Sequence, residues 1–245
     1  MPKFSIITVC KNSELTISRT IESVLNQTYK DFEYIIVDGK STDNTMKIVN
    51  SYNKKTNANI VAICEDDSGI YEAINKGIKI ATGEWIGIIM SQDWYEEDTL
   101  ENVNNILKKI KRNSIVYGMC RILNEKLETT SIVFNTDINF RNGPMMHEAC
   151  FISKYCYEKN GLYNLDYKYA SDLDLLYKYK NNGVDFVPVE KVLANFSLGG
   201  ASSKVKSKLE GLSIRKKYGY INMFEYLIRY IYILIKEVKQ KYENK

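Results

Sequence analysis

Strand-like and helix-like patterns alternate through the first 118 residues of the chain. Continuous apolar runs rich in branched residues are typical of strands buried on both faces, and they occupy residues 4–9, 33–38, 59–64, 84–90 and 114–118. Apolar residues recur at helical spacing in between, over residues 17–25, 41–52, 70–81 and 100–110. The alternation predicts an α/β fold with a Rossmann-like, mostly parallel central sheet flanked by helices.

The second half of the chain is less regular. Residues 167–183 predict a helix that starts near Ser171 and ends at Gly183, and residues 184–200 indicate a strand, a turn and a short extended run. A length of 245 residues suits one large domain with a tail. We therefore expect a domain over 1–203, with a first half at 1–118 and a less regular half at 119–203, followed by a tail at 204–245.

The tail carries the positive charge of the chain. From Lys204 onward there are 11 Lys and Arg against 4 Asp and Glu, whereas the preceding 203 residues have 23 against 26. Residues 222–243 predict an amphipathic helix with basic residues among Tyr, Ile and Leu. Such a helix packs on its own domain, binds a partner, or lies in the inner-membrane interface, and we expect the last. No recognised nucleic-acid module accompanies the charge, so we expect no nucleic-acid binding.

The cysteines and the N-terminus indicate a cytoplasmic protein. The five cysteines form no CxxC pair, and the single histidine leaves little for a zinc site. The N-terminal "MPKFSIITVCKN" lacks the pattern of a signal peptide, and no apolar run approaches the roughly 18 residues of a spanning helix. The sequence leaves a homo-oligomer open.

Polar residues follow four of the predicted strands. They are Lys11 and Asn12, then Asp38, Lys40 and Ser41, then Glu65, Asp66 and Asp67, then Ser91, Gln92 and Asp93. Ligands of doubly wound sheets bind at this edge, and crowded carboxylates there favour a hard divalent cation such as Mg²⁺ or Mn²⁺. No GxxxxGK[ST] or GxGxxG follows the first strand, which weakens the kinase-like and dinucleotide-binding alternatives.

Three segments resemble glycosyltransferase family 2, whose members are inverting enzymes of GT-A fold that use nucleotide-sugar donors. They run from "FSIITVCKNSELTISRTIESVLNQTYKDFEYIIVDGKSTDNT" through "DSGIYEAINKGIKIATGEWIGIIMSQDW" to "YASDLDLL", and cover about residues 3–200. Within the family the chain looks most similar to bacterial enzymes that build capsule, O-antigen or related surface polysaccharides. Residues 1–118 would then bind the nucleotide sugar and residues 119–203 the acceptor.

The resemblance also implies roles for individual residues. Asp172 in "ASDLDL" matches the catalytic base, and Asp93 matches the metal-binding carboxylate of a paired-Asp motif that here is Gln92-Asp93. The residues expected to line the nucleotide-sugar pocket are Thr8, Val9, Lys11, Asn12, Asp38, Asp67, Asn75 and Gln92. The residues expected on the acceptor side are Trp94, His147 and Glu148.

Three positions depart from the family pattern. Asp38-Gly39 stands where many members have Asp-Asp, Gln92 replaces one carboxylate of the metal motif, and "NFSLGGAS" has no late histidine. The metal would then depend on Asp93, the diphosphate and water, because Mg²⁺ sites often use only one or two carboxylates. We expect weaker metal binding without nucleotide than in a relative with paired aspartates.

Structural alternatives exist for the same residues. Asp93 would also suit a helix N-terminus, Asp172 a helix cap, and Asp174 is a competing base two residues on. His147 would also suit an ordinary satisfied polar site, and Trp94 simple packing.

The sequence thus predicts a metal-dependent inverting glycosyltransferase. It would move a hexose or N-acetylhexosamine from a nucleotide sugar, with UDP expected, to a glycan or lipid-linked acceptor at the cytoplasmic face of the membrane. The alternative is a catalytically silent nucleotide-sugar binding subunit of a transferase complex, which Gln92 motivates. A nucleotidyltransferase would need a Gly/Arg/Lys-rich loop after the first strand, and "VCKNSEL" matches poorly.

Overall fold

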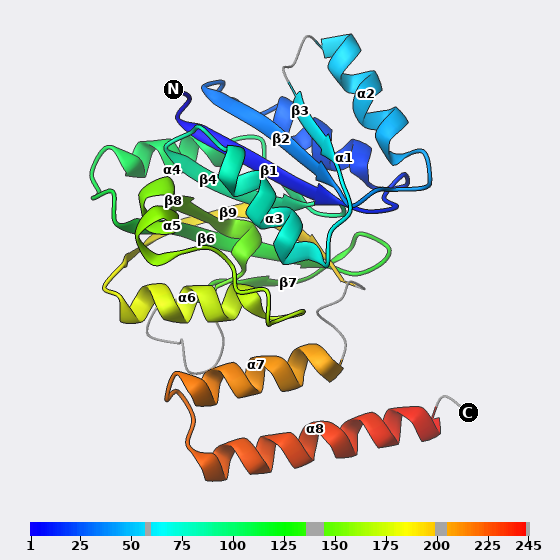
Figure 1. Cartoon of the computed structure of the whole chain (residues 1–245), viewed down its shortest axis with the longest axis vertical. Coiled ribbons are helices and arrows are strands. Elements are labelled where there is room, and N and C mark those ends of the chain that lie inside the picture. The colour runs from blue at the N-terminus through cyan, green and yellow to red at the C-terminus, as the bar shows by residue number, and fades with distance from the viewer. Residues whose placement is uncertain (57–59, 136–144, 199–204, 244–245) are drawn as a thin grey trace.

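The computed structural model describes residues 1–56, 60–135, 145–198 and 205–243 (Figure 1). Within them, one mixed sheet has the strand order β3-β2-β1-β4-β8-β6-β9-β5, with β7 paired to β6. The strands are β1 Phe4–Cys10, β2 Phe32–Asp38, β3 Ile60–Cys64, β4 Trp85–Met90, β5 Trp94–Tyr95, β6 Ser114–Leu123, β7 Thr129–Val133, β8 Cys150–Ser153 and β9 Asp185–Ser197. The helices are α1 Ile17–Leu25, α2 Thr45–Thr56, α3 Ile70–Ile80, α4 Thr99–Leu107, α5 Lys154–Asn160, α6 Ser171–Asn181, α7 Val205–Lys217 and α8 Met223–Glu243, with a 3₁₀ turn η2 at His147–Ala149.

The first four strands form the parallel half of the sheet. β1 pairs with β2 on one side and β4 on the other, so that Ile7 lies opposite both Ile35 and Ile88. These strands confirm the predicted runs, although residue 59, the expected start of the third, lies outside the described residues. The strand order reverses between β1 and β4, and this reversal sets the ligand edge at their carboxyl ends.

The second half of the sheet inserts later strands beside β4. β8 pairs antiparallel with both β4 and β6, and β9 pairs parallel with β6 along the length of β6. The prediction of a strand, a turn and a short extended run over 184–200 was wrong over the described part. β9 is one continuous strand there, and its pairing register with β6 shifts beside Gly118 and Met119 of β6. Pro188 is tolerated because, among the described strands, β5 pairs with β9 at Ala194 and Asn195 alone, so none of them needs a backbone N–H from position 188 on that side.

Helices cover both faces of the sheet. On one face, α1, α2 and α4 bury apolar residues such as Ile21, Val49 and Val103. On the other, α3, α5 and α6 bury residues such as Ile74 and Leu176. The helix predicted over 41–52 is confirmed as α2, which begins at Thr45, where the Asp43 carboxylate accepts hydrogen bonds from the Thr45 N–H and hydroxyl.

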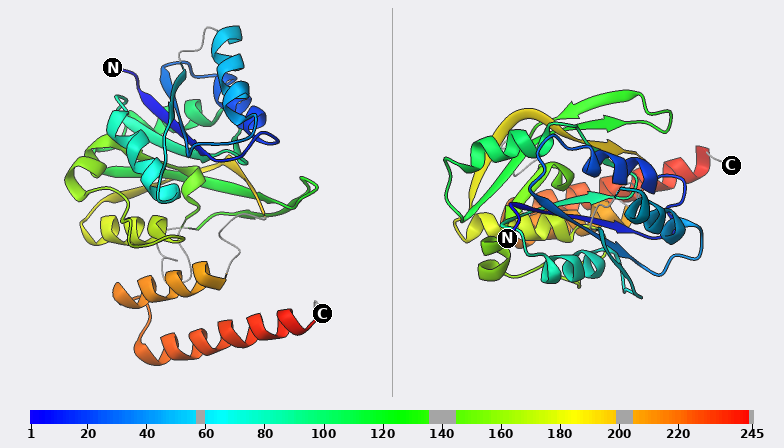
Figure 2. Two further views of the ribbon diagram at one scale, coloured as in Figure 1. Left: turned by 45° about the vertical axis from the view of Figure 1, so that its right-hand side comes forward. Right: turned by 90° about the horizontal axis from the view of Figure 1, so that it is seen from above.

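The described C-terminal residues form two helices, of which α8 confirms the helix predicted over 222–243 and α7 was not predicted. α7 lies below α6, and α8 is the outermost element, packed along α7 (Figures 1 and 2). The Lys217 Nζ on α7 lies 2.8 Å from the Asp174 Oδ1 on α6. α7 is therefore fastened to the helix that carries Asp172. No helix in the described ranges is long and apolar enough to cross a bilayer.

Candidate active site

A wide pocket lies at the carboxyl ends of β1 and β4, as the strand order predicts. We call it the strand-end pocket. Its volume is about 730 Å³, and the turn that begins α3 closes one side. Five of the residues expected to bind the nucleotide sugar line this pocket, namely Val9, Lys11, Asn12, Asp67 and Gln92. Asn12 has a left-handed backbone (φ 49°), and its Oδ1 accepts a hydrogen bond from the Thr42 N–H at 2.9 Å, which fixes the turn after β1.

The other three expected pocket residues do not line it in this structure. Thr8 is fully buried, with its Oγ1 3.0 Å from the Tyr34 hydroxyl. Asp38 is also fully buried, and its Oδ2 accepts hydrogen bonds from the Ser41 N–H at 2.8 Å and from the Cys64 thiol at 3.1 Å. Asn75 bonds both the N–H and the carbonyl of Tyr163, at 3.1 and 2.9 Å. These side chains support the walls of the pocket rather than facing into it.

Gly39 explains part of the departure from the family pattern. A Cβ at this position would lie 2.5 Å from the Asp67 Oδ2 and 3.3 Å from the Lys11 Cδ. Gly39 is absent from the glycines with positive φ, so a side chain here would meet no backbone strain and would need only the Asp67 carboxylate to shift. The carboxylate of Asp67 thus occupies the space into which a side chain at position 39 would project.

A second, smaller pocket adjoins the first through Gln92 and Ile70, and we call it the inner pocket. Its volume is about 290 Å³. Residues from β4, η2 and α6 meet there, and the predicted site residues among them are Gln92, Asp93, His147, Glu148 and Asp172. The structure therefore brings the expected metal ligand, acceptor-side pair and base together, although the chain separates them by up to 80 positions.

Two buried carboxyl groups form the floor of the inner pocket. Asp93 is fully buried, and its Oδ1 accepts a hydrogen bond from the Ser197 N–H at 2.9 Å. Burial raises the pKa of Asp93 well above its usual range, and the nearby Glu148 raises it further. Burial also raises the pKa of Glu148, against the opposing influence of His147. The pair binds protons more readily than free carboxyl groups do.

His147 lies between the floor and Asp172. Its Nδ1 is 3.3 Å from the Glu148 Oε1 and 3.7 Å from the Asp172 Oδ2. On its other side Asp172 accepts a hydrogen bond from the Tyr71 hydroxyl, at 2.9 Å to Oδ1. The Tyr71 ring stacks on Tyr163 with centroids 5.6 Å apart. Asp172, in the first turn of α6, is thus held by the Tyr71 hydroxyl and flanked by His147.

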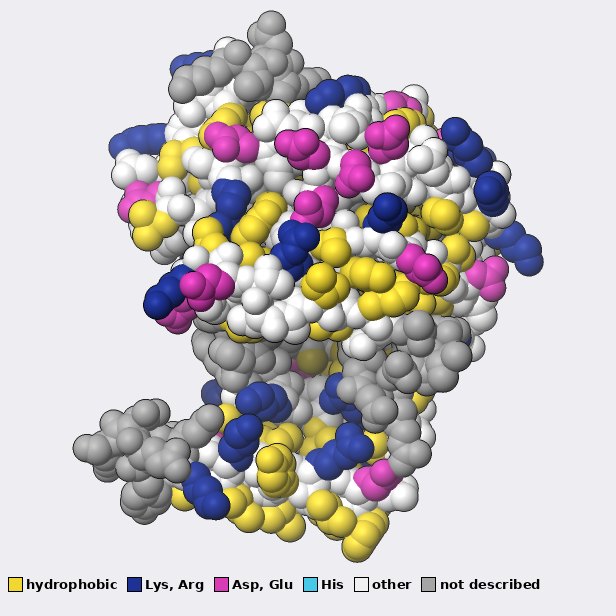
Figure 3. All heavy atoms as spheres, turned by 180° about the vertical axis from the view of Figure 1, so that it is seen from behind, with side chains coloured by type: hydrophobic (Ala, Val, Ile, Leu, Met, Phe, Trp, Pro, Cys, Tyr) yellow, Lys and Arg dark blue, Asp and Glu magenta, His cyan; other side chains and the backbone are white. Residues whose placement is uncertain are grey.

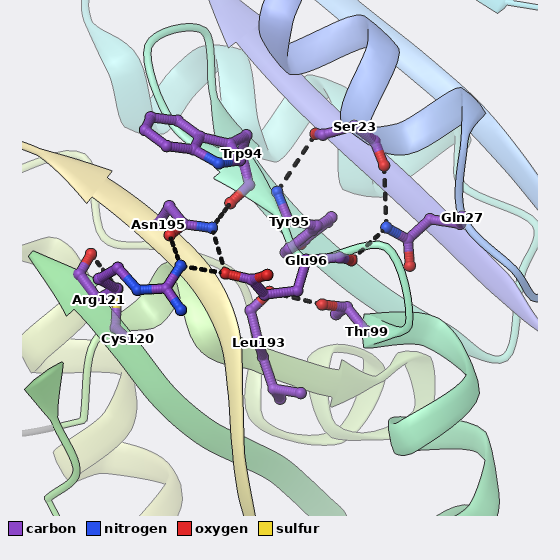
Figure 4. Close-up of polar contacts among 10 residues, drawn as sticks. All are labelled: Ser23, Gln27, Trp94, Tyr95, Glu96, Thr99, Cys120, Arg121, Leu193 and Asn195. Atoms are coloured by element: carbon purple, nitrogen blue, oxygen red, sulfur yellow. Dashed lines mark hydrogen bonds and ion pairs between the residues drawn. The ribbon is translucent and has the colours of Figure 1, made fainter. Parts of the chain in front are cut away.

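A polar network fixes the turn that carries Asp93 (Figure 4). The Asn195 Nδ2 donates to the Glu96 Oε1 at 3.0 Å, and Arg121 Nη1 bonds both Glu96 and Asn195. Trp94 lies beside this network rather than in the inner pocket, with the Arg19 guanidinium 3.9 Å from its ring centroid. Packing on Arg19 therefore accounts for Trp94 in this structure, and its acceptor contact stays a prediction.

The residues of the inner pocket suit a divalent cation that draws further ligands from its substrate. No cluster of three or more His, Cys, Asp or Glu side chains is arranged to hold a metal in the described part of the chain. The Asp93 Oδ2, however, is buried without a hydrogen-bond partner there. A single such oxygen fits Mg²⁺ or Mn²⁺ when diphosphate and water complete the shell. The segment "NFSLGGAS", in which no late histidine ligand occurs, lies partly outside the described residues, from Gly199 on.

Tyr71 was not identified from the sequence as part of the site. It stands in the quoted "DSGIYEAINKG", but its helical spacing with Ile74 and Ile78 is also typical of a core residue. The available signal was a tyrosine on the apolar face of a helix, directed at the edge of the sheet. A buried Tyr hydroxyl needs a hydrogen-bond partner, so such a tyrosine indicates a polar group nearby. The partner, Asp172, is 101 residues away.

Comparisons with known proteins identify the family and the fold. A family model described as "Glycosyl transferase family 2" matches residues 5–164. A "PGL/p-HBAD biosynthesis glycosyltransferase" of Mycobacterium tuberculosis is 29% identical over 210 residues, covering 84% of this chain and 82% of that protein. An uncharacterized glycosyltransferase of Haemophilus influenzae is 27% identical over 249 residues, covering 95% and 96%.

Solved structures share the fold at low identity. S. aureus TarS 1–349 in complex with UDP-GlcNAc is 19% identical with a TM-score of 0.71, covering 88% of this chain and 65% of that one. The mannosyltransferase PcManGT from Pyrobaculum calidifontis, in complex with GDP-Man and Mn²⁺, is 16% identical with a TM-score of 0.69, covering 90% and 65%. The chain spans less than two thirds of both solved chains, and 39% of a longer TarS chain. The likeness confirms the predicted α/β fold of GT-A type.

Proposed function

This chain belongs to glycosyltransferase family 2, and we propose that it is a metal-dependent inverting transferase. It moves a hexose or N-acetylhexosamine from a nucleotide sugar, a UDP-sugar, to a glycan or lipid-linked acceptor in surface polysaccharide synthesis. Solved structures of the same fold hold UDP-GlcNAc, or GDP-Man with Mn²⁺, which supports a nucleotide-sugar donor and a divalent cation.

One observation carries the proposal. The strand-end pocket has room for a nucleotide, and the inner pocket that it joins presents Asp93 and Asp172 to the same space. An inverting transfer needs a base on the acceptor hydroxyl and positive charge near the leaving diphosphate, on opposite sides of the sugar. Gln92 lines both pockets and marks the junction where the sugar would lie.

The proposed reaction is a single displacement. The Asp172 carboxylate takes the proton of the acceptor hydroxyl while that oxygen forms a bond to the anomeric carbon. The bond from this carbon to the diphosphate breaks, and its electron pair leaves with the nucleoside diphosphate. The Tyr71 hydroxyl and His147 keep Asp172 oriented. Mg²⁺ or Mn²⁺, held by the Asp93 Oδ2, would supply charge stabilisation for the diphosphate.

The outer face of α8 supports a location at the cytoplasmic membrane face. Large apolar side chains away from α7 are half exposed or more, including Phe224 at 71% and Ile231 at 55%. Figure 3 shows Lys and Arg side chains over this part of the molecule, with hydrophobic ones along its outer edge. A helix of this kind lies in the headgroup region of anionic bilayers. The burial of its apolar side chains and the attraction of its basic ones to anionic lipid both strengthen binding there. Flotation with phosphatidylglycerol vesicles tests this, and we expect Ile231→Asp with Ile235→Asp to abolish binding.

Donor binding and transfer test the main proposal directly. UDP-, GDP- and TDP-sugars are screened by thermal shift with and without Mn²⁺, since a ligand at 100 times its Kd stabilises by about 2.7 kcal/mol. We expect the strongest shift with a UDP-sugar and Mn²⁺. Absence of both a shift and transfer across donors and lipid-linked acceptors refutes the proposal. Binding without turnover by the isolated chain would favour the silent subunit instead, whereas turnover eliminates it.

A further inference from the structure

A carboxylate on α7 holds the loop that leads into α6. Glu210 accepts three backbone hydrogen bonds, from the N–H groups of Lys168 at 2.9 Å, Tyr169 at 2.6 Å and Ala170 at 2.7 Å. Hydrogen bonds to an ionised carboxylate are stronger than neutral ones. The loop over residues 165–170 therefore has a backbone fixed from below by the C-terminal helices, directly before Asp172.

The same helix fixes a tyrosine of this loop. The Lys217 Nζ donates to the Tyr167 hydroxyl at 3.3 Å and lies 5.3 Å from the Tyr167 ring centroid. Lys217 itself is paired with Asp174 at 2.8 Å. The ring consequently has a defined orientation, although Tyr167 is only partly buried.

A third pocket lies between this loop and the turn that begins α3. Its volume is about 300 Å³, which is at the small end of ligand pockets and suits one sugar unit. Tyr167, Tyr169 and Leu165 line it on the loop side, and Glu72 on the helix side. It shares Ile70, Tyr71, Lys168 and Tyr169 with the inner pocket. A chain of sugars could therefore pass from one pocket into the other.

We propose that this third pocket is an acceptor subsite for a sugar unit adjacent to the one that is glycosylated. The inference rests on the proposed function and deepens it, since it makes the acceptor an oligosaccharide-bearing molecule rather than a single sugar. Aromatic rings such as Tyr167 and Tyr169 pack against the C–H faces of sugars, and the Lys168 ammonium donates to hydroxyls. The lining holds one acid, Glu72, and one base, Lys168, so the charges of the pocket balance, which suits a neutral sugar.

Glu210 acts in this proposal as a positioning residue for the subsite. Its side chain accepts three hydrogen bonds from the loop backbone and does not line the strand-end pocket, so replacement should alter glycan binding without changing donor binding. A glutamine offers one acceptor oxygen and no charge for three N–H groups. The loop would then lose part of its anchor while the helix keeps a side chain of equal size.

A glycan array tests the subsite without requiring transfer. The full chain, with UDP and Mn²⁺, is applied to immobilised mono-, di- and trisaccharides. We expect binding to a subset of di- and trisaccharides, and binding weakened about fivefold to tenfold in Tyr167→Ala and in Leu165→Asp. Leu165 is half exposed and lines only this pocket among the three, so its variant should fold. Glu210→Gln should weaken the same glycans while the thermal shift with UDP stays unchanged.

Two variants of α5 are the matched controls for this test. Tyr155→Ala removes an exposed tyrosine from α5, away from the pocket, and Glu158→Gln a carboxylate from the same helix. Both should bind glycans as the unaltered chain does. Absence of glycan binding, or equal binding by the Leu165 and Tyr167 variants, overturns the subsite. A missing UDP shift, by contrast, refutes the proposed function and is scored separately.

Discussion

Substitution of Gly39 should weaken donor binding through Asp67. A Cβ at position 39 would sit 2.5 Å from the Asp67 Oδ2, whereas ordinary contacts lie between 3.4 and 4 Å, so the carboxylate must move by about an ångström. The Asp67 Oδ1 also accepts a hydrogen bond from the Gly69 N–H at 3.1 Å. Displacement of Asp67 therefore disturbs the turn that closes the strand-end pocket.

The size of the effect follows from packing and charge. Overpacking costs about 1–3 kcal/mol, and the lower end applies because Asp67 is partly exposed and its carboxylate can shift. Gly39→Ala should thus weaken UDP-sugar binding about fivefold. Gly39→Asp adds repulsion between carboxylates about 4 Å apart, worth a further ~1 kcal/mol near water, for a loss of about 30-fold in total.

The double variant Gly39→Asp/Asp67→Ser should recover most of this loss. The serine vacates the space into which the new carboxylate projects, so the two substitutions should be strongly non-additive. Isothermal titration with UDP and the UDP-sugar measures four variants, namely Gly39→Ala, Gly39→Asp, Asp67→Ser and the double variant. Gly211→Ala on α7 is the matched control, because the new Cβ would lie an ordinary 3.5 Å from Leu173 of α6. Unchanged affinity in Gly39→Asp, or a double variant weaker than either single one, would refute the reasoning.

Three further changes have distinct expected outcomes. Tyr71→Phe removes a hydrogen bond to Asp172 of about 1.5–3 kcal/mol and should lower kcat roughly tenfold to hundredfold in steady-state assays, with donor KM unchanged. Gln92→Asp should tighten binding of free Mn²⁺, measured by titration without nucleotide; equal affinity contradicts the proposed metal site. Burial would raise the pKa of Glu33, but hydrogen bonds from Ser5, Thr82 and Gly83 lower it overall. Its stabilising effect is therefore present above the unfolded pKa near 4.5 and lost as pH falls through the lower folded pKa. Glu33→Gln should lower the free energy of unfolding in urea by about 0.5–1 kcal/mol at pH 7, since solvent screens this half-buried group, and the gap should close as the pH falls below 4.5.

The parallel half of the fold was predictable because its signals are local. Each of β1, β2 and β4 is a continuous apolar run, and the helices between them carry clear stripes. The continuous β9 was not predictable in the same way. Pro188 and the charges around it are typical of a turn, and only pairing with β6 keeps the segment extended. The sequence did not predict α7, because its few buried residues make only a weak apolar stripe.

Which residues meet in the inner pocket was easier to predict from the sequence than the direction in which each side chain points. The positions of Asp93 and Asp172 after a strand and before a helix brought both to the inner pocket. The inward turn of Asp38 was not visible, since it depends on partners at Cys64 and Ser41. Glu210 was beyond sequence reasoning as well, because its three partners are backbone groups about 40 residues away.

Transfer by Asp172→Asn tests the central claim most directly. The amide keeps the size of the side chain and can still accept from Tyr71, but it cannot take the acceptor proton. Transfer should fall by a factor of about 10³ or more, while the UDP-sugar Kd stays within about twofold of that of the unaltered chain. Asp174→Asn tests the competing base two residues on. That carboxylate pairs with Lys217, which contacts Tyr167, and lies outside the inner pocket, so its loss should lower transfer far less than Asp172→Asn does. Normal transfer by Asp172→Asn, or equal loss of transfer and donor binding, would contradict the account.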